Sequence, residues 1–219
     1  MKTFVLVLAA LGLLLATACG DDPTGPPPPV ENPPQNLTQR SHVLDNIEYA
    51  YNTRRLGVYD DLLNADFVFY FSSDDVGAGT PESWNRAEDL EATERLFLSN
   101  QQTENPPADP VCRSMRLDLV FDEAAITWVE VQPPAFPTET WYAVTVFYTA
   151  TFEIEPNTTY ITQNGAKAEF TVRNAGTDQY PHWELVEFRD LGSTFVRRTG
   201  ADVSEATWGS VKALYSPSS

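Results

Sequence analysis

Cysteine and histidine are scarce in this sequence of 219 residues, which contains two of each. They are Cys19, Cys112, His42 and His182, and because they form no local cluster the sequence predicts no zinc or iron site. A nucleophilic Cys112 would need a histidine as its base, and we interpret this cysteine as structural. A phosphate-binding glycine loop and an EF-hand spacing are missing as well, so we predict no cofactor and no metal.

Basic residues are few. Lysine and arginine number 14 against 31 aspartate and glutamate residues, which gives a net charge of -17. Such a surface repels phosphate backbones, so we do not expect nucleic acid as a partner. Hydrophobic residues make up 42% of the chain and aromatic residues 12%, and these contents indicate a packed globule rather than a disordered chain.

The N-terminal apolar run is too short to span a bilayer permanently. Phe4 to Leu15 is about a dozen residues, against the roughly 20 of a transmembrane helix, and it suits a signal peptide. Ala16-Thr17-Ala18 then precedes Cys19, which resembles the lipobox of bacterial lipoproteins. The resemblance implies that residues 1–18 are a lipoprotein signal peptide and that Cys19 carries the lipid. An ordinary signal peptide cleaved after Ala18 is the alternative.

Proline is concentrated just after this cysteine. Residues 19–36 contain Pro26 to Pro29 and the pair Pro33-Pro34, which favour extended polyproline II structure. At roughly 3 Å per residue this tether spans about 50 Å. We therefore expect residues 37–219 to form a domain anchored to a membrane, in the periplasm or at the cell surface. By analogy with lipoprotein sorting in Gram-negative bacteria, Gly20 after the cysteine favours the outer membrane.

Helical periodicity dominates the first part of this domain. Leu44, Ile47 and Tyr51 recur at helical spacing, and Gly57 is expected to end the helix that carries them. Trp84 is placed on the apolar face of a later helix that starts near a proline. The elements predicted here are helices over 38–56, 58–64 and 81–99 and a strand over 67–71.

From Cys112 onward the period changes to two. The clearest strand covers 141–155, where Tyr142, Val144 and Val146 begin one apolar face and Thr145 lies on the other. Further strands are predicted over 112–121, 167–173 and 182–189, followed by a short helix over 204–215 that packs Trp208 and Leu214. Helices followed by long antiparallel strands predict an α+β fold with a curved sheet around the N-terminal helices.

This order resembles the NTF2-like superfamily, the cone-shaped fold shared by SnoaL-like and ketosteroid-isomerase-like proteins. Three features carry the resemblance: the helical opening that leads into Asp66-Phe67, the long alternating strands, and the close from Trp183 to Asp190. The resemblance implies helices packed in the concave face of a curved antiparallel sheet. It also implies a homodimer through the outer face of the sheet, where Thr145, Thr149 and Thr151 lie.

An isomerase of this family needs a carboxylate base inside the cone and donors for a developing oxyanion. The residue that corresponds to the base is Phe71, and an apolar ring cannot take a proton. Asp74 or Asp75, with Tyr70 or Tyr51 as a donor, would have to replace it. That assignment defines the alternative function, a SnoaL-like lyase or isomerase acting on a small apolar substrate.

Aromatic residues either line a cavity in the cone or fill the core. The candidates for a pocket lining are Tyr51, Phe69, Phe71, Trp84, Tyr142, Tyr148 and Trp183. Because this fold hosts both enzymes and binding proteins, the fold does not decide the activity. Our preferred hypothesis is a non-catalytic domain that binds a small molecule or a protein partner.

Overall fold

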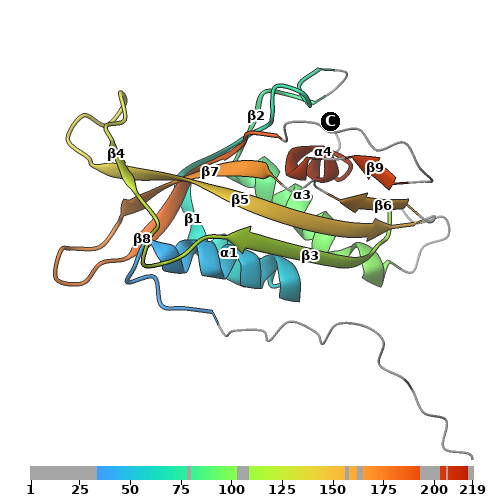
Figure 1. Cartoon of the computed structure of the whole chain (residues 1–219), viewed down its shortest axis with the longest axis horizontal. Helices are drawn as coiled ribbons and strands as arrows, with labels where there is room; N and C mark the ends of the chain where they lie inside the picture. Colours follow the sequence, from blue (N-terminus) through green and yellow to red (C-terminus); the bar gives the residue numbers. More distant parts are fainter. Residues whose placement is uncertain are drawn as a thin grey trace, which may run out of the picture. The chain divides into compact units, whose positions relative to one another are not determined.

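Helices line the concave side of one curved sheet in the computed structural model of this chain (Figure 1). The structure describes residues 34–77, 80–102, 109–155, 158–161, 165–192, 203–205 and 207–216. The predicted signal peptide, the lipid site Cys19 and most of the tether lie outside these ranges. The helices are α1 Ser41–Thr53, α2 Leu56–Leu62, α3 Arg86–Leu98 and α4 Trp208–Ala213, and a 3₁₀ turn covers Ser99–Gln101.

The sheet has the order β2-β1-β8-β7-β5-β6-β9, and β3 and β4 also pair with β5. Its pairings are antiparallel except β1 with β8 and β6 with β9, which are parallel. The described strands are β1 Leu63–Tyr70, β2 Ser83–Asn85, β3 Cys112–Val120, β4 Val129–Val131, β5 Trp141–Ile154, β6 Thr158–Ile161, β7 Ala166–Asn174, β8 Trp183–Asp190 and β9 Val203–Glu205. The predicted α+β class and the curved sheet around N-terminal helices are confirmed.

Strand β5 shows why the sheet was predictable. Val144, Val146 and Tyr148 are buried, whereas Thr145 and Phe147 are exposed, because successive side chains of a strand point to opposite faces. The buried face packs against the helices and forms one continuous core with them. The predicted alternation along this strand is therefore confirmed.

The first helix ends earlier than predicted. Arg54 adopts left-handed backbone angles with φ of 55°, which terminates α1, so Gly57 lies inside α2 and does not break the first helix. A side chain with a Cβ rarely takes this conformation. Its guanidinium donates hydrogen bonds to the carbonyls of Phe97 at 3.1 Å and Cys112 at 2.8 Å, which hold the residue in place.

The helix predicted over 81–99 begins later. Trp84 lies on the short strand β2 instead, where it pairs with Phe69 of β1. Asn85 then caps α3: its side chain accepts from the backbone N–H groups of Ala87 and Glu88, and the Glu88 carboxylate accepts from the N–H of Asn85. This reciprocal cap satisfies backbone donors at the first turn and fixes the start of the helix.

The C-terminal helix α4 packs on the concave side of the sheet, next to α3 (Figure 1). Trp208 is fully buried as predicted, but Leu214 is 39% exposed, so that part of the prediction is wrong. Thr207 and Ser210 form the reciprocal cap of this helix. Within the described ranges, every helix is too short or too polar to cross a membrane.

Candidate functional site

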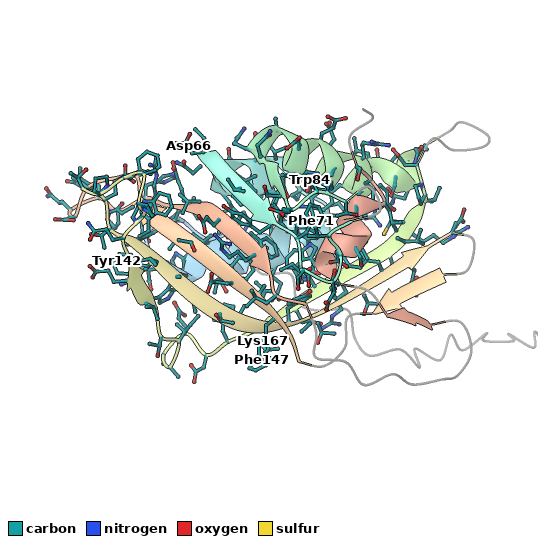
Figure 2. All side chains as sticks on the ribbon, turned by 90° about the horizontal axis from the view of Figure 1, so that it is seen from above. Asp66, Phe71, Trp84, Tyr142, Phe147 and Lys167 are labelled. Carbon is teal, nitrogen blue, oxygen red and sulfur yellow. The ribbon has the colours of Figure 1, made fainter. Side chains whose placement is uncertain are left out.

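The interior of the cone is filled by side chains. Of the aromatic residues predicted to line a pocket, those placed here are Tyr51, Phe69, Phe71, Trp84 and Tyr148, and none of them exceeds 6% exposure. Figure 2 shows Phe71 and Trp84 next to each other, and their ring centroids are 4.6 Å apart in an edge-to-face contact. Such contacts are typical of a packed aromatic core.

Trp208 of α4 occupies the centre of this interior. Its ring lies 4.8 Å from Tyr51, 5.5 Å from Tyr148 and 4.5 Å from Phe188. These rings come from α1, β5 and β8, so the helix touches both the helical and the sheet walls of the cone. A small molecule could enter the cone at this position only after α4 had moved.

The N-terminus of α4 is bound to a buried carboxylate. Asp190, which ends β8 and is 2% exposed, accepts the N–H of Gly209 at 2.7 Å and the hydroxyl of Tyr148 at 3.0 Å. The same hydroxyl accepts the N–H of Trp208 at 3.1 Å. Burial raises the pKa of Asp190, although the N–H groups of Gly209 and Gly192 oppose the rise. Asp190 therefore holds the first turn of α4 by accepting the Gly209 N–H. It also accepts the Tyr148 hydroxyl beside that turn and the N–H of Gly192.

Asp75 binds the same end of α4. Its carboxylate accepts a hydrogen bond from the Thr207 hydroxyl, and burial raises its pKa while this bond lowers it. Gly209 fits closely here: a Cβ at that position would lie 2.9 Å from Phe71 Cδ1 and 3.3 Å from oxygens of both Asp75 and Asp190. Asp75, the candidate general base, is therefore hydrogen-bonded to the residue that caps α4.

The other members of the catalytic alternative lie elsewhere. Asp74 is exposed, and its backbone N–H donates to Ser72 Oγ at 3.3 Å. Tyr70 is on the opposite side of β1 from the buried Phe69, and the guanidinium carbon of Arg189 lies 3.8 Å from its ring centroid. The structure thus separates Tyr70 and Asp74 from the interior, places Asp75 at its edge and buries the alternative donor Tyr51 inside it.

A buried ion pair lies deeper in the cone and was not predicted. Lys212 of α4 pairs with Asp89 of α3, both side chains are 0% exposed, and Asp89 also accepts the Tyr59 hydroxyl at 2.9 Å. Burial lowers the pKa of Lys212, but the charge and hydrogen bond of Asp89 together with the neighbouring Tyr51 outweigh it, and the pKa is raised. A signal was present: Lys212 falls in the apolar helical stripe of Trp208, Val211 and Tyr215.

Cys112 is buried, and burial raises the pKa of its thiol to about 11, although the Arg54 guanidinium opposes this. A thiol in this environment stays protonated at neutral pH and is a poor nucleophile. Across the described ranges, no three His, Cys, Asp or Glu residues lie close enough together to hold a metal ion.

Tyr142 and Trp183 do not reach the interior of the cone. Tyr142 lies at the far end of β5 from Phe71 and Trp84 (Figure 2), and its ring contacts Trp183 at 5.6 Å. Both residues line an open surface groove of about 780 Å³, which we call the aromatic groove. It is defined by Arg40, Glu123, Trp128, Tyr142, Asp178 and Trp183. Backbone pairing of Trp183 N–H with the Leu37 carbonyl at 2.8 Å fixes the N-terminal segment beside it.

Arg40 is the central side chain of the aromatic groove. Its guanidinium carbon lies 4.1 Å from the ring centroid of Tyr142, 5.2 Å from that of Trp183 and 5.8 Å from that of Trp128. Distances of this size are those of cation–π contacts. The predicted pocket residues thus form two separate groups, one closed within the cone and one open at the surface.

No protein-family model and no curated protein matches the chain. Solved structures do match. A conserved protein from Planctomyces limnophilus has 14% identity and a TM-score of 0.46, with 68% of this chain and 90% of that chain covered. An uncharacterised protein with a cystatin-like fold from Caulobacter vibrioides has 14% identity and a TM-score of 0.41, with 70% and 87% covered.

An NTF2-like protein of unknown function in nutrient uptake from Rhodospirillum rubrum has 15% identity and a TM-score of 0.43, with 72% of this chain and 99% of that chain covered. The described domain is an α+β cone with a curved, open sheet. The structures that it is similar to include proteins described as NTF2-like or as having a cystatin-like fold, in keeping with the resemblance noted in the sequence. Similarity at this level of identity concerns the fold alone and does not extend to activity.

Proposed function

We propose that this chain is an extracytoplasmic lipoprotein whose NTF2-like domain binds a small molecule without catalysing a reaction. The observation that carries the proposal is the placement of α4 inside the cone. Its N–H groups and the Thr207 hydroxyl engage Asp190 and Asp75, the two acids at the edge of the interior. A general base must be within reach of a substrate proton, and these carboxylates are instead bonded to the chain itself.

The aromatic groove supports the binding part of the proposal. It has a volume within the usual range for small-molecule sites, and the rings of Trp128, Tyr142 and Trp183 remain partly exposed in it. Aromatic rings with neighbouring hydroxyl, amide and charged groups are the usual lining of such sites. The groove also lies beside the N-terminal segment through which the tether would reach the domain.

A ligand screen with groove variants tests this function. Purified full-length chain is screened against a small-molecule library by thermal shift, and each hit is titrated against Trp183→Ala and Tyr142→Ala. Tyr180→Ala is the matched control, because Tyr180 is an aromatic residue of the β7–β8 loop that is 73% exposed and lies outside the groove. Hits should lose affinity in the groove variants only. A library without any groove-dependent hit would contradict the proposed site.

The membrane anchor is tested separately at Cys19. In a bacterial host, wild-type chain should incorporate a labelled fatty acid and fractionate with membranes, and the Cys19→Ser variant should do neither because it has no thiol to acylate. Lipid incorporation that persists in the serine variant would contradict the proposed lipid site. Separation of inner and outer membranes then tests the expected outer-membrane location.

The lyase or isomerase remains the second candidate, and Asp75 is the observation that favours it. This carboxylate has a raised pKa at the edge of an aromatic interior, which is the environment of a general base. Turnover of small apolar carbonyl compounds that disappears in the Asp74→Asn, Asp75→Asn double variant would support it. Turnover unchanged in that variant would exclude this catalytic assignment.

A further inference from the structure

Arg40 differs from the other partly buried cations of this acidic domain. Arg86, Arg95, Arg173, Arg189 and Lys212 each form an ion pair with an acid, and Arg54 donates hydrogen bonds to backbone carbonyls. In the part of the chain that the structure describes, the Arg40 guanidinium has ring contacts only, with no ion pair and no hydrogen bond. A guanidinium carries five N–H donors, and those of Arg40 are accessible to a ligand because the residue is partly exposed and lines the groove.

The ring contacts prepare this guanidinium for a ligand. The contacts with the Tyr142 and Trp183 rings restrict the rotation of this long side chain, so less freedom is lost when a ligand binds it. A carboxylate matches two parallel N–H groups of arginine, and such charge-assisted pairs are among the stronger hydrogen bonds in proteins. The unpaired donors therefore favour a carboxylate as the anchor group of the ligand.

The rim of the groove carries the opposite charge. Glu123, whose carboxylate accepts the Ser41 hydroxyl at 2.8 Å, and Asp178 both line the groove and are exposed. A ligand with a carboxylate alone would face two negative groups and one positive group. A ligand that also carries an ammonium group complements all three charges.

We propose that the aromatic groove binds a zwitterionic α-amino acid with an apolar side chain. Its carboxylate pairs with Arg40, its ammonium group faces Glu123 and Asp178, and its side chain lies against the ring of Trp128. This assignment rests on the proposed binding function and specifies the class of ligand. The groove is a surface site separate from the closed interior of the cone.

Three related probes test the two charged contacts by calorimetric titration of the full-length chain at neutral pH. L-phenylalanine has both groups, L-phenylalaninamide lacks the carboxylate, and N-acetyl-L-phenylalanine lacks the ammonium group. Loss of a charge-assisted contact weakens binding about 10- to 100-fold. L-phenylalanine should bind, and both blocked compounds should bind more weakly by about this factor.

Variants of Arg40 separate recognition from packing. Arg40→Lys keeps a cation on the aromatic rings but loses the two-pronged contact, and Arg40→Gln loses the charge. Both should weaken L-phenylalanine binding, and Arg40→Gln should abolish the preference for the acid over the amide. Arg55→Gln is the matched control for net charge, because Arg55 is exposed and outside the groove. Circular dichroism establishes that each variant is folded.

The outcomes distinguish this inference from the function on which it rests. Equal weakening of the acid and the amide by Arg40→Gln would mean that Arg40 only shapes the groove, and would overturn the inference. So would a groove-dependent ligand from the library screen whose affinity does not depend on Arg40. In both cases the proposed binding function would stand, whereas a groove that binds no compound at all would overturn both.

Discussion

Removing one partner of the Lys212–Asp89 ion pair tests how α4 is held in the cone. Lys212→Met leaves the Asp89 carboxylate buried with only the Tyr59 hydroxyl as a described side-chain partner. Breaking a buried pair in this way costs about 3–5 kcal/mol. Lys212 Nζ also lies 4.6 Å from the ring centroid of Phe69, a contact that the variant loses. Because domains have unfolding free energies of roughly 5–15 kcal/mol, the variant should be close to unfolding.

Removing both charges should cost much less. Asp89→Asn keeps an acceptor for the Tyr59 hydroxyl, and in the Lys212→Met, Asp89→Asn double variant no uncompensated charge is left inside. Replacement of a whole buried pair by neutral groups is often near neutral. We therefore expect the double variant to lose less stability than either single variant.

Urea denaturation followed by circular dichroism measures the free energy of unfolding of all three variants. Lys167→Met is the matched control, since Lys167 is exposed on the outer face of the sheet beside Phe147 (Figure 2), and it should change stability by less than about 0.5 kcal/mol. Single-variant losses below about 1 kcal/mol would refute the reasoning. A double-variant loss equal to the sum of the two single losses would refute it as well.

Three further predictions concern α4, pH and assembly. Gly209→Ala should cost about 1–3 kcal/mol in urea denaturation because its Cβ has no room, whereas Gly57→Ala, in α2 with open space around it, should cost nothing; equal effects would contradict the close packing. The pKa values of Asp190 and Asp75 are raised by burial, so the native state binds more protons, and unfolding free energy should fall as pH rises above the reference value of 3.8; a wild-type dependence that is unchanged in the Asp75→Asn, Asp190→Asn double variant would contradict this. If the outer sheet face forms the expected homodimer, sedimentation should show a dimer that Phe147→Glu dissociates; an unchanged dimer in the variant would place the interface elsewhere.

Local patterns predicted most of the elements. The alternation along β5 and the apolar stripe of α1 depend on residues within one element, and both appear as expected. The predicted start of α3 is too early because the apolar spacing of Trp84 suggests a helical position. The reciprocal cap formed by Asn85 and Glu88 fixes the actual start one residue after Asn85. Arg54 in the left-handed region was missed because residues far along the chain accept its hydrogen bonds.

The candidate sites were harder to predict, since they depend on distance along a strand as well as on its face. Tyr142 and Tyr148 lie on the same face of β5, but they are six residues apart. At roughly 3.3 Å per residue this places them about 20 Å apart along the strand. They consequently belong to different sites. Lys212 was missed for a related reason: its partner Asp89 lies 123 positions away in the sequence, and no local pattern predicts that pairing.

The position of α4 links these observations to function. Asp75, the acid on which the enzyme alternative rests, and the buried Asp190 both bind the N-terminal end of this helix. A substrate in the cone would therefore compete with α4 for the carboxylate oxygens that hold this end of the helix. With Lys212 paired to a second buried acid and Trp208 packed among the aromatic rings, the helix acts as part of the core. The open aromatic groove, by contrast, is where we propose that a ligand binds, and occupying it requires no displacement of α4.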